Sequence, residues 1–334
     1  MAVENAPWAV DGAKHSGAVS RTLAYASTNG AEGVIGPGDL AVLATQTPSN
    51  QVRVMPGGAA IRNRAASGGQ QTYTARNVSQ TLVTVEPTGS SGGRTDYVWA
   101  HIVDPEYSGQ VPENPLEAQY FFITASAGQP PGNGWYRLAR INIPANTQTI
   151  TQAMITDLRE VANPREKRVR FPRPVVNGHI SGYSHVLRHR RNGTGQDRGE
   201  QFPDAANGGR FDLEIPEWAT RMHVDAEWTS VRYDGRSSWG AFYLQYRGQD
   251  GVWRSTQDFG WDVAEGAVQS TNWVMHDNLF IPSAMRGGPV SFYMRAFVDT
   301  ATSAQTGAVS LTGRSGLHLE VTFYEVAEWT GVNV

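Results

Sequence analysis

The chain has 334 residues, which is enough for two domains of ordinary size, each with its own hydrophobic core. Its formal net charge of −3 excludes a general attraction to nucleic acid or to an anionic membrane, and the absence of cysteine excludes disulfides, thiolate nucleophiles and cysteine metal sites. No stretch approaches the roughly 18 consecutive apolar residues of a membrane span, and the first residues lack the regions of a signal peptide. We therefore expect no nucleic-acid binding, no membrane insertion and no export by a signal of its own.

The first half of the chain is predicted to be a β-rich domain, residues 1–165. Residues 20–45 are rich in glycine and are expected to form an extended N-terminal segment. Further along, short extended runs are broken by turn residues, and the apolar residues of these runs, such as Val52 and Val54, recur with a period of two. This pattern is typical of β-strands.

A short helix or 3₁₀ turn is expected to close this domain within residues 149–162. Thr149 or Thr151 offers an N-cap, because a hydroxyl there can accept from the first backbone N–H groups. Ile155 and Leu158 then fall at helical spacing.

A basic run follows the first domain. It contains Arg165, Lys167, Arg168, Arg170 and Arg173. Such a run forms either a docking surface for an anion or a partner, or a solvated connector, and we favour the connector because charge runs are usually solvated. Together with the polar, glycine-rich stretch that follows it, the run predicts an arginine-rich linker over residues 166–203.

The remaining residues, 204–334, are predicted to form a β-sandwich. Met222, Val224, Ala226 and Trp228 alternate with polar residues, the pattern of a half-buried strand, and Trp228 is therefore assigned to the core. Similar runs give about seven or eight strands. The predicted fold class is all-β: an N-terminal β-rich domain, a linker and a C-terminal jelly-roll-like β-sandwich.

Tryptophans near turns suggest a binding surface in the second half. Trp239, Trp253 and Trp261 lie close to glycines, with Tyr233 and Arg236 nearby. Aromatic faces stack on sugar rings while charged neighbours bond the hydroxyls, so these five residues are candidate glycan-binding residues. The alternative is that they pack in the core or at a subunit interface, where tryptophan is also frequent.

No motif for catalysis is present, and we predict no catalytic residue, no metal and no cofactor. His179, His185 and His189 could hold a metal if three copies met at a trimer axis, but surface histidines in a polar linker are the favoured interpretation. The many acids of the second half offer no assignable pair of the kind that a glycosidase needs.

The first half resembles the N-terminal part of minor tail proteins of siphophages that infect actinobacteria. The stretches that carry this resemblance occur in one order: "WAVDGAKHSGAVSRTLAYASTNGAEGVIGPGDLAV", "VRVMPGGAAIRN", "TGSSGGRTDYVWAHIVDP" and "LARINIPANTQTITQAMITDLREVANPR". The resemblance implies a unit that docks to a tail tip or baseplate, followed by a variable part that often faces a receptor. It ends at about Arg165 and implies no ligand beyond it.

Two hypotheses about function follow. In the first, the chain is a structural virion protein of a phage tail, made in the host cytoplasm, that docks by residues 1–165 and presents the sandwich to the host. It would be no enzyme, and its partners would be two further copies in a homotrimer, other tail-tip or baseplate proteins and a cell-surface glycan. In the alternative, the sandwich is a depolymerase or esterase that acts on envelope polysaccharide.

Overall fold

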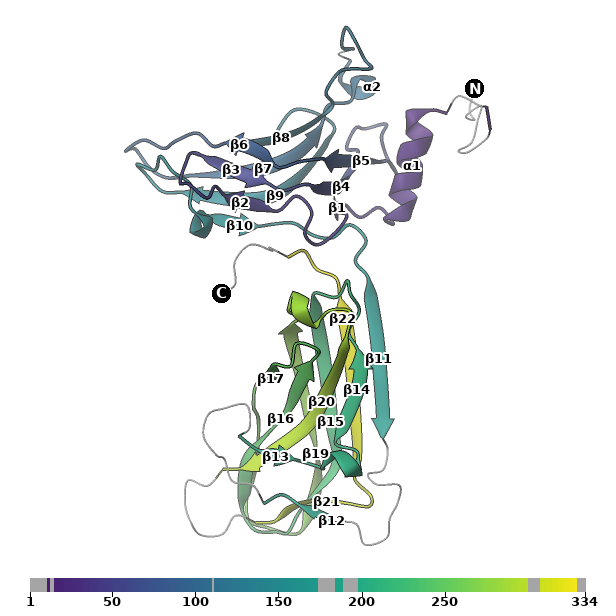
Figure 1. The fold of residues 1–334 in the computed structure, drawn as a ribbon, viewed down its shortest axis with the longest axis vertical. Helices are drawn as coiled ribbons and strands as arrows, with labels where there is room; N and C mark the ends of the chain where they lie inside the picture. Colours follow the sequence, from purple (N-terminus) through teal and green to yellow (C-terminus); the bar gives the residue numbers. More distant parts are fainter. Residues whose placement is uncertain are drawn as a thin grey trace. The chain divides into compact units, whose positions relative to one another are not determined.

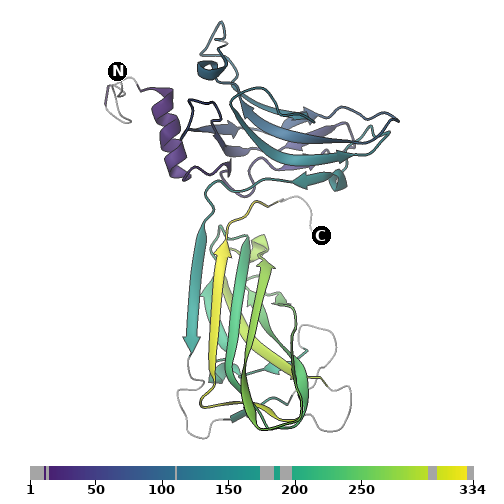
Figure 2. The ribbon, with the colours of Figure 1, turned by 180° about the vertical axis from the view of Figure 1, so that it is seen from behind.

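The structure is a computed structural model, and it describes residues 11–12, 15–109, 111–173, 184–188, 198–299 and 307–328. The chain divides into two compact units, which Figures 1 and 2 show from opposite sides. The first unit comprises Met1–Pro164 and Val326–Val334, and the second comprises Arg165–Glu325. In the described ranges no helix has both the length and the apolar character that a membrane crossing requires.

The first unit consists mainly of three small antiparallel sheets. The first contains β1 (Gly33–Val34), β4 (Gly57–Arg62) and β5 (Thr72–Asn77), and the second contains β2 (Val42–Ala44), β3 (Gln51–Val54) and β6 (Thr81–Thr84). The third has the order β10 (Ile155–Asp157), β9 (Gly134–Ile143), β7 (Arg94–Ile102) and β8 (Phe121–Ser126). Alternate residues such as Val52, Val54 and Ile141 are fully buried and form one shared core.

The predicted extended segment at residues 20–45 is wrong at its start, where α1 (Gly17–Ser27) is a helix. Ser16 caps this helix, since its hydroxyl accepts a hydrogen bond from the backbone N–H of Val19 at 3.2 Å. No residue of α1 is buried. The helix therefore lacks the apolar stripe that marks most helices in a sequence, and the later glycines lie beyond its end.

Of the short helix or 3₁₀ turn predicted within residues 149–162, the structure has the 3₁₀ turn, η1 (Gln152–Met154). Thr151 precedes this turn but makes no side-chain capping bond. Strand β10 follows at once and pairs antiparallel with β9, with Ile155 opposite Ile141. The free edge of β9 offers a row of backbone partners, and this tertiary pairing outweighs a weak helical spacing.

The second unit is a sandwich of two six-stranded antiparallel sheets. The β15 sheet has the order β11 (Glu166–Arg173), β22 (Gly316–Tyr324), β15 (Arg221–Tyr233), β21 (Val309–Thr312) and β12 (Ser184–Val186), with β19 (Gln269–Phe280) also paired to β15. The β16 sheet has the order β13 (Glu200–Gln201), β20 (Pro289–Val298), β16 (Ser238–Gly248) and β17 (Trp253–Ser255), with β14 (Arg210–Glu214) on β20 and β18 (Phe259–Val263) on β16. The predicted all-β class with a jelly-roll-like sandwich is confirmed.

The sandwich core is built by the alternation that the sequence shows. Met222, Val224, Ala226 and Trp228 all point inward from β15 and are buried. Strands β20 and β22 contribute their own inward sets: Val290, Phe292, Met294 and Ala296 from the first, and Leu317, Leu319, Val321 and Phe323 from the second. This one cluster spans both sheets and holds them together.

The predicted linker over residues 166–203 is wrong. Its first eight residues are β11, which forms an unbroken antiparallel ladder with β22, and β12 and β13 also come from this range. Residues 174–183 and 189–197 lie outside the described residues. Three arginines of the basic run are ion-paired: Arg165 with Glu325 at 2.6 Å, and Arg168 and Arg170 with Glu320. Arg173 donates instead to the backbone carbonyl of Gly208. A charged strand at the edge of a sheet discourages pairing with other chains.

The second unit is an insertion into the first. Its first strand, β11, and its last strand, β22, are neighbours, so the chain enters and leaves the sandwich at adjacent points. After Glu325 the chain returns to the first unit, where Ala327 packs on the core and the backbone N–H of Glu328 donates to the carbonyl of Pro37 at 2.9 Å.

Candidate ligand-binding face

Two of the five predicted glycan-binding residues belong to the core, so their prediction is wrong. Tyr233 is 1% exposed, and its hydroxyl accepts a hydrogen bond from the indole N–H of Trp273 at 2.6 Å. Trp261 is 7% exposed and stacks on Trp273, with ring centroids 5.4 Å apart. Neither ring can be stacked on by a ligand without opening the sandwich.

Arg236 and Trp239 do not join Trp253 in one site. Arg236 is exposed and forms an ion pair with Asp234 at 2.5 Å, while Trp239 is half-buried near the start of β16. Trp253 lies opposite Arg247 near the other end of β16, eight residues away. Eight residues of strand span about 26 Å, which is longer than a disaccharide. Of the predicted set, only Trp253 is both exposed and placed among other candidate ligand contacts.

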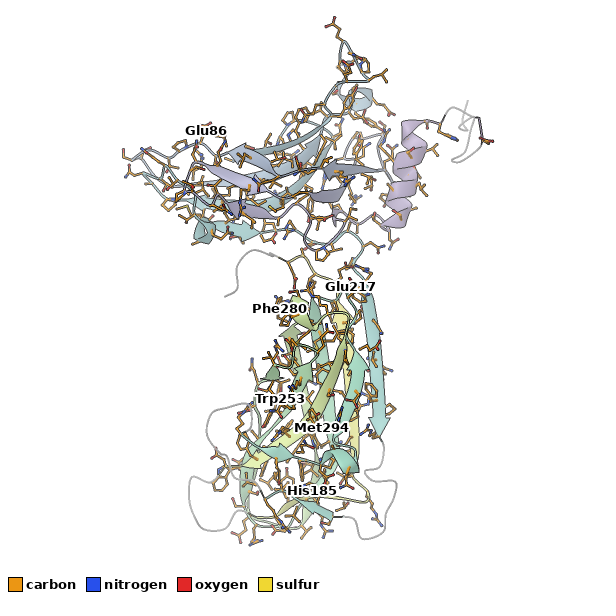
Figure 3. The ribbon with its side chains drawn as sticks, viewed as in Figure 1. Glu86, His185, Glu217, Trp253, Phe280 and Met294 are labelled. Carbon is orange, nitrogen blue, oxygen red and sulfur yellow. The ribbon has the colours of Figure 1, made fainter. Side chains whose placement is uncertain are left out.

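Trp253 lies on the outer face of the β16 sheet, where four strands bring an aromatic and polar surface together. The ring is 40% exposed and is labelled in Figure 3. Tyr293 on β20 lies beside it, with ring centroids 5.4 Å apart and planes at 54°, and the guanidinium of Arg247 lies 5.4 Å from the indole centroid. We call Trp253, Tyr293, Arg247, Arg210 and Asp212 the Trp253 face.

The polar part of the Trp253 face comes from β14 and β20. The Nε of Arg210 donates to Asp212 at 2.8 Å, and the hydroxyl of Ser291 donates to the same carboxylate oxygen at 2.6 Å. Partial burial acts to raise the pKa of Asp212, but the hydrogen bonds from Ser291 and Arg210 outweigh it and leave the pKa below its usual value. The pair is therefore charged at neutral pH beside an aromatic surface.

This arrangement suits a ligand with one apolar and one hydroxylated side. The indole and phenol rings offer flat area at little cost in side-chain entropy, while Arg210, Asp212 and Arg247 offer donors and acceptors around it. Alternation on β14 and β20 places these residues in the outward phase, so they could have been found from the sequence. The distance in sequence between a tryptophan and a glycine carries no information about that phase.

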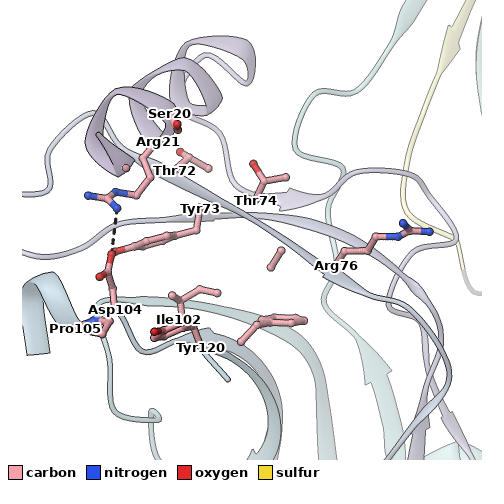
Figure 4. A pocket seen from close by; sticks show the side chains of 13 residues that line it. Ser20, Arg21, Thr72, Tyr73, Thr74, Arg76, Ile102, Asp104, Pro105 and Tyr120 are labelled. Carbon is pink, nitrogen blue, oxygen red and sulfur yellow. Dashed lines mark hydrogen bonds and ion pairs between the residues drawn. The ribbon is translucent and has the colours of Figure 1, made fainter. Parts of the chain in front are cut away.

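A second hollow lies in the first unit, with a volume of about 590 Å³, between α1, β5 and the segment after β7 (Figure 4). Arg21 and Tyr73 both contact Asp104 Oδ2, at 3.2 and 3.0 Å. Burial and the Asp104 charge raise the pKa of Tyr73, so its phenol stays a donor. The polar groups of these three side chains are therefore hydrogen-bonded to one another, and the bonds hold α1 against the sheet. Because they are already paired, the hollow is a weaker candidate for ligand binding.

The predicted histidine cluster is described only in part. His185 lies on β12 with its ring edge-on to Phe202, and its Nδ1 is 4.0 Å from Asp204. His179 and His189 lie outside the described residues. The prediction that these three histidines hold no metal stays a prediction.

Comparisons with known proteins give no family. No protein-family model matches the chain, and no curated protein matches it. Among solved structures, the infectious bursal disease virus Gx strain is 10% identical over 89% of this chain and 76% of that one, with a TM-score of 0.25. Latent PorU from Porphyromonas gingivalis is 7% identical over 72% of this chain and 22% of that one, with a TM-score of 0.27. Scores this low carry no argument about function.

Proposed function

We propose that the chain is a structural virion protein of a phage tail tip or baseplate that binds a host-surface glycan. In this proposal the first unit docks to the tail, and the second unit presents the Trp253 face. The resemblance of the first half to minor tail proteins supports the tail assignment. The observation that carries the binding role is the exposed Trp253 beside the half-buried Tyr293, with Arg247 alongside and the charged Arg210–Asp212 pair on the same sheet face.

The carboxyl groups support binding without bond cleavage. A glycosidase needs one carboxylic acid whose pKa is raised so that it can donate a proton. Among the described residues, every carboxyl with a resolved shift has a lowered pKa: Asp212, Asp225, Asp234, Asp250, Glu320 and Glu325. These acids suit ion pairs better than general-acid catalysis, so the depolymerase or esterase remains the second candidate.

The proposal includes assembly as a homotrimer within the virion, together with other tail-tip or baseplate proteins. The edges of the β16 sheet are short strands that can be covered by neighbouring subunits. Light scattering on the purified chain tests this part. A monomer at high micromolar concentration, with or without the neighbouring tail proteins, contradicts the trimer and leaves the glycan-binding part to be judged separately.

The glycan-binding part is tested with the full chain and polysaccharide extracted from an actinobacterial host envelope. Truncating a central aromatic contact costs about 2 kcal/mol, so Trp253→Ala should weaken binding about thirtyfold. Phe280→Ala is the matched control, because Phe280 is an aromatic residue that is 47% exposed on the other sheet. Wild-type affinity in Trp253→Ala, or an equal loss in Phe280→Ala, refutes the Trp253 face as the binding site.

The same incubation separates binding from hydrolysis. New reducing ends or released acyl groups, formed with turnover, would establish the enzyme in place of the binding protein. We expect neither, and we expect the polysaccharide to be recovered at its original size. Both variants should keep the thermal unfolding transition of the wild type, so that a change in binding reports on the surface and not on folding.

A further inference from the structure

The outer face of the β15 sheet brings two histidines and an aspartate together. His223 and Asp225 are two residues apart on β15 and therefore point to the same side. His276 on β19 lies directly opposite Asp225 in the strand register. The aspartate and His276 are 51 residues apart in sequence, so only the pairing of β15 with β19 makes them neighbours.

The ring nitrogens of both histidines converge on one carboxylate oxygen. His223 Nε2 lies 3.1 Å from Asp225 Oδ1, and His276 Nδ1 contacts the same oxygen. The two imidazole planes are 9° from parallel, with centroids 6.3 Å apart. One ligand atom from each of the three side chains lies within 4.8 Å of the other two.

Asn278 orients the first of these histidines. Its Oδ1 lies 2.8 Å from His223 Nδ1 and can accept an N–H from that nitrogen. Nε2 is then the nitrogen that faces Asp225 Oδ1, 3.1 Å away, where either a proton on Nε2 or a metal ion would link the ring to the carboxylate. A hydrogen-bond acceptor on the far nitrogen is the usual support of a metal-binding histidine.

The surroundings leave Asp225 as the carboxylate that can act as a ligand. Glu320 lies opposite Asp225 on β22, but its oxygens are engaged by Arg168 and Arg170. These two arginines also balance the charge of Glu320. Glu227, the next outward carboxylate on β15, accepts a hydrogen bond from the side-chain amide of Asn272. His276, by contrast, has a side chain that is 62% exposed and has room to rotate.

We propose that His223, Asp225 and His276 bind one divalent transition-metal ion, of which Zn²⁺ fits best. Two imidazoles and one carboxylate suit Zn²⁺, Co²⁺ or Ni²⁺, whereas Ca²⁺ and Mg²⁺ prefer sites made of oxygen alone. Zinc ligands at about 2.1 Å lie about 3.4 Å from one another, whereas both ring nitrogens now lie closer than this to Asp225 Oδ1. The nitrogens must therefore move away from the carboxylate to admit the ion, which rotation of the exposed His276 permits. The remaining coordination positions face solvent and would take water or a ligand group from another molecule.

The ion would join β19 to its neighbour. Among the described strands, β19 pairs with β15 and with no second partner, so it is an edge strand. A metal held by residues of both strands stabilises the folded state by mass action, because the unfolded chain lacks the assembled site. This role is independent of the proposed glycan binding, which uses the opposite sheet.

The test uses the full chain without an affinity tag, stripped with EDTA and dialysed. Titration calorimetry with ZnCl₂ should give one ion per chain, and Zn²⁺ should raise the thermal unfolding midpoint whereas the same concentration of CaCl₂ should not. His276→Ala, at an exposed position, should abolish the one-to-one isotherm while the unfolding transition in EDTA is retained. Asn278→Ala should weaken binding roughly tenfold or more.

His318→Ala is the matched control, since His318 lies on the same face of the same sheet outside the three-residue cluster. It should bind Zn²⁺ as the wild type does. No Zn²⁺ binding by the wild type means that the three side chains form a metal-free hydrogen-bonded cluster, and this overturns the proposal. If His318→Ala loses Zn²⁺ binding as fully as His276→Ala, the ion binds elsewhere and the proposal is overturned. An unchanged isotherm in the double variant His223→Ala/His276→Ala overturns the proposal for the same reason.

Discussion

Replacement of Trp228 separates two contributions to the stability of the sandwich. The side chain is fully buried and packs against Phe242 and Trp273, with ring centroids 5.2 and 6.2 Å away. Its indole N–H donates to the backbone carbonyl of Phe202 at 2.6 Å. Trp228→Phe keeps an aromatic ring but removes the donor, whereas Trp228→Ala removes both the ring and the donor.

The two substitutions should differ in size. A buried carbonyl left without its partner costs about 1–3 kcal/mol, which sets the expected loss for Trp228→Phe at about 2 kcal/mol. Truncation of a core tryptophan to alanine costs about 3–5 kcal/mol before the orphaned carbonyl is added. Trp228→Ala should therefore lose at least about 5 kcal/mol, comparable with the whole stability of many domains.

Urea unfolding followed by circular dichroism measures both losses. The midpoint should fall in the order wild type, Trp228→Phe, Trp228→Ala, with an unchanged m-value for the phenylalanine variant. Trp253→Ala is the control at an exposed tryptophan and should cost no more than about 1 kcal/mol. If Trp228→Phe is as stable as the wild type, the Phe202 hydrogen bond contributes nothing. If the two alanine variants lose equal amounts, the assignment of Trp228 to the core is refuted.

Three further predictions concern ion pairs and strand pairing. Arg21→Ala should destabilise α1 by about 1–3 kcal/mol, because it leaves Asp104 without its cation, and hydrogen exchange in residues 17–27 should rise while Arg21→Lys rises less. The Glu325 carboxyl is partly buried, which alone would raise its pKa, but hydrogen bonds from Arg165 outweigh this and lower it. Its contribution to stability is thus complete above the usual pKa of 4.5 and is lost as pH falls through the lower folded value. Glu325→Gln should accordingly lower the urea midpoint more at pH 7 than at pH 3, and equal losses at both would contradict the pairing. Trypsin should leave the native chain uncut after Arg168 and Arg170, since both lie within the β11 ladder, and early fragments ending there would show by mass spectrometry that β11 is not stably paired.

The alternation of apolar residues was sufficient to predict the sandwich core but not to place Tyr233. Inward residues of β15 have even numbers as far as Trp228. A β-bulge between Trp228 and Val231, with Ser230 at φ 53°, shifts the phase, so that Val231 and Tyr233 point inward. Nothing in the local sequence announces this shift, and the exposed position predicted for Tyr233 is wrong for that reason.

Trp261 was predicted to be exposed because a glycine near it indicated a turn, but glycine also occurs within strands where a neighbouring group needs the space of a side chain. Gly240 was interpreted as a turn residue, yet it lies within β16 directly opposite Trp261 on β18. A Cβ on Gly240 would lie 2.1 Å from the backbone oxygen of Phe297 and 2.8 Å from the Trp261 ring, so the absence of a side chain makes room both for the neighbouring strand and for the indole. The sequence marks the glycine but does not say whether a turn or a neighbouring ring requires it.

The His223, Asp225 and His276 cluster could not be predicted from the sequence, because it depends on strand register. The first two residues form an alternating pair that can be recognised on a strand, but His276 joins them through strand register alone. A shift of one residue between β15 and β19 would turn His276 to the opposite face. Spacing in the sequence therefore raised His185 and His189, four residues apart, as possible metal ligands, with surface histidines as the favoured interpretation, and it did not indicate the cluster that the fold assembles.

The chain enters and leaves the sandwich at adjacent points, so the second unit could be replaced by another domain. Arg165 and Glu325 are bonded to each other at its base, through a backbone N–H and a guanidinium that both donate to the carboxylate. Any domain whose two ends lie equally close together could replace residues 165–325 by recombination without lengthening the path of the first unit. Under the proposed function, a lineage that keeps the docking unit could thus acquire a new binding unit in a single genetic event.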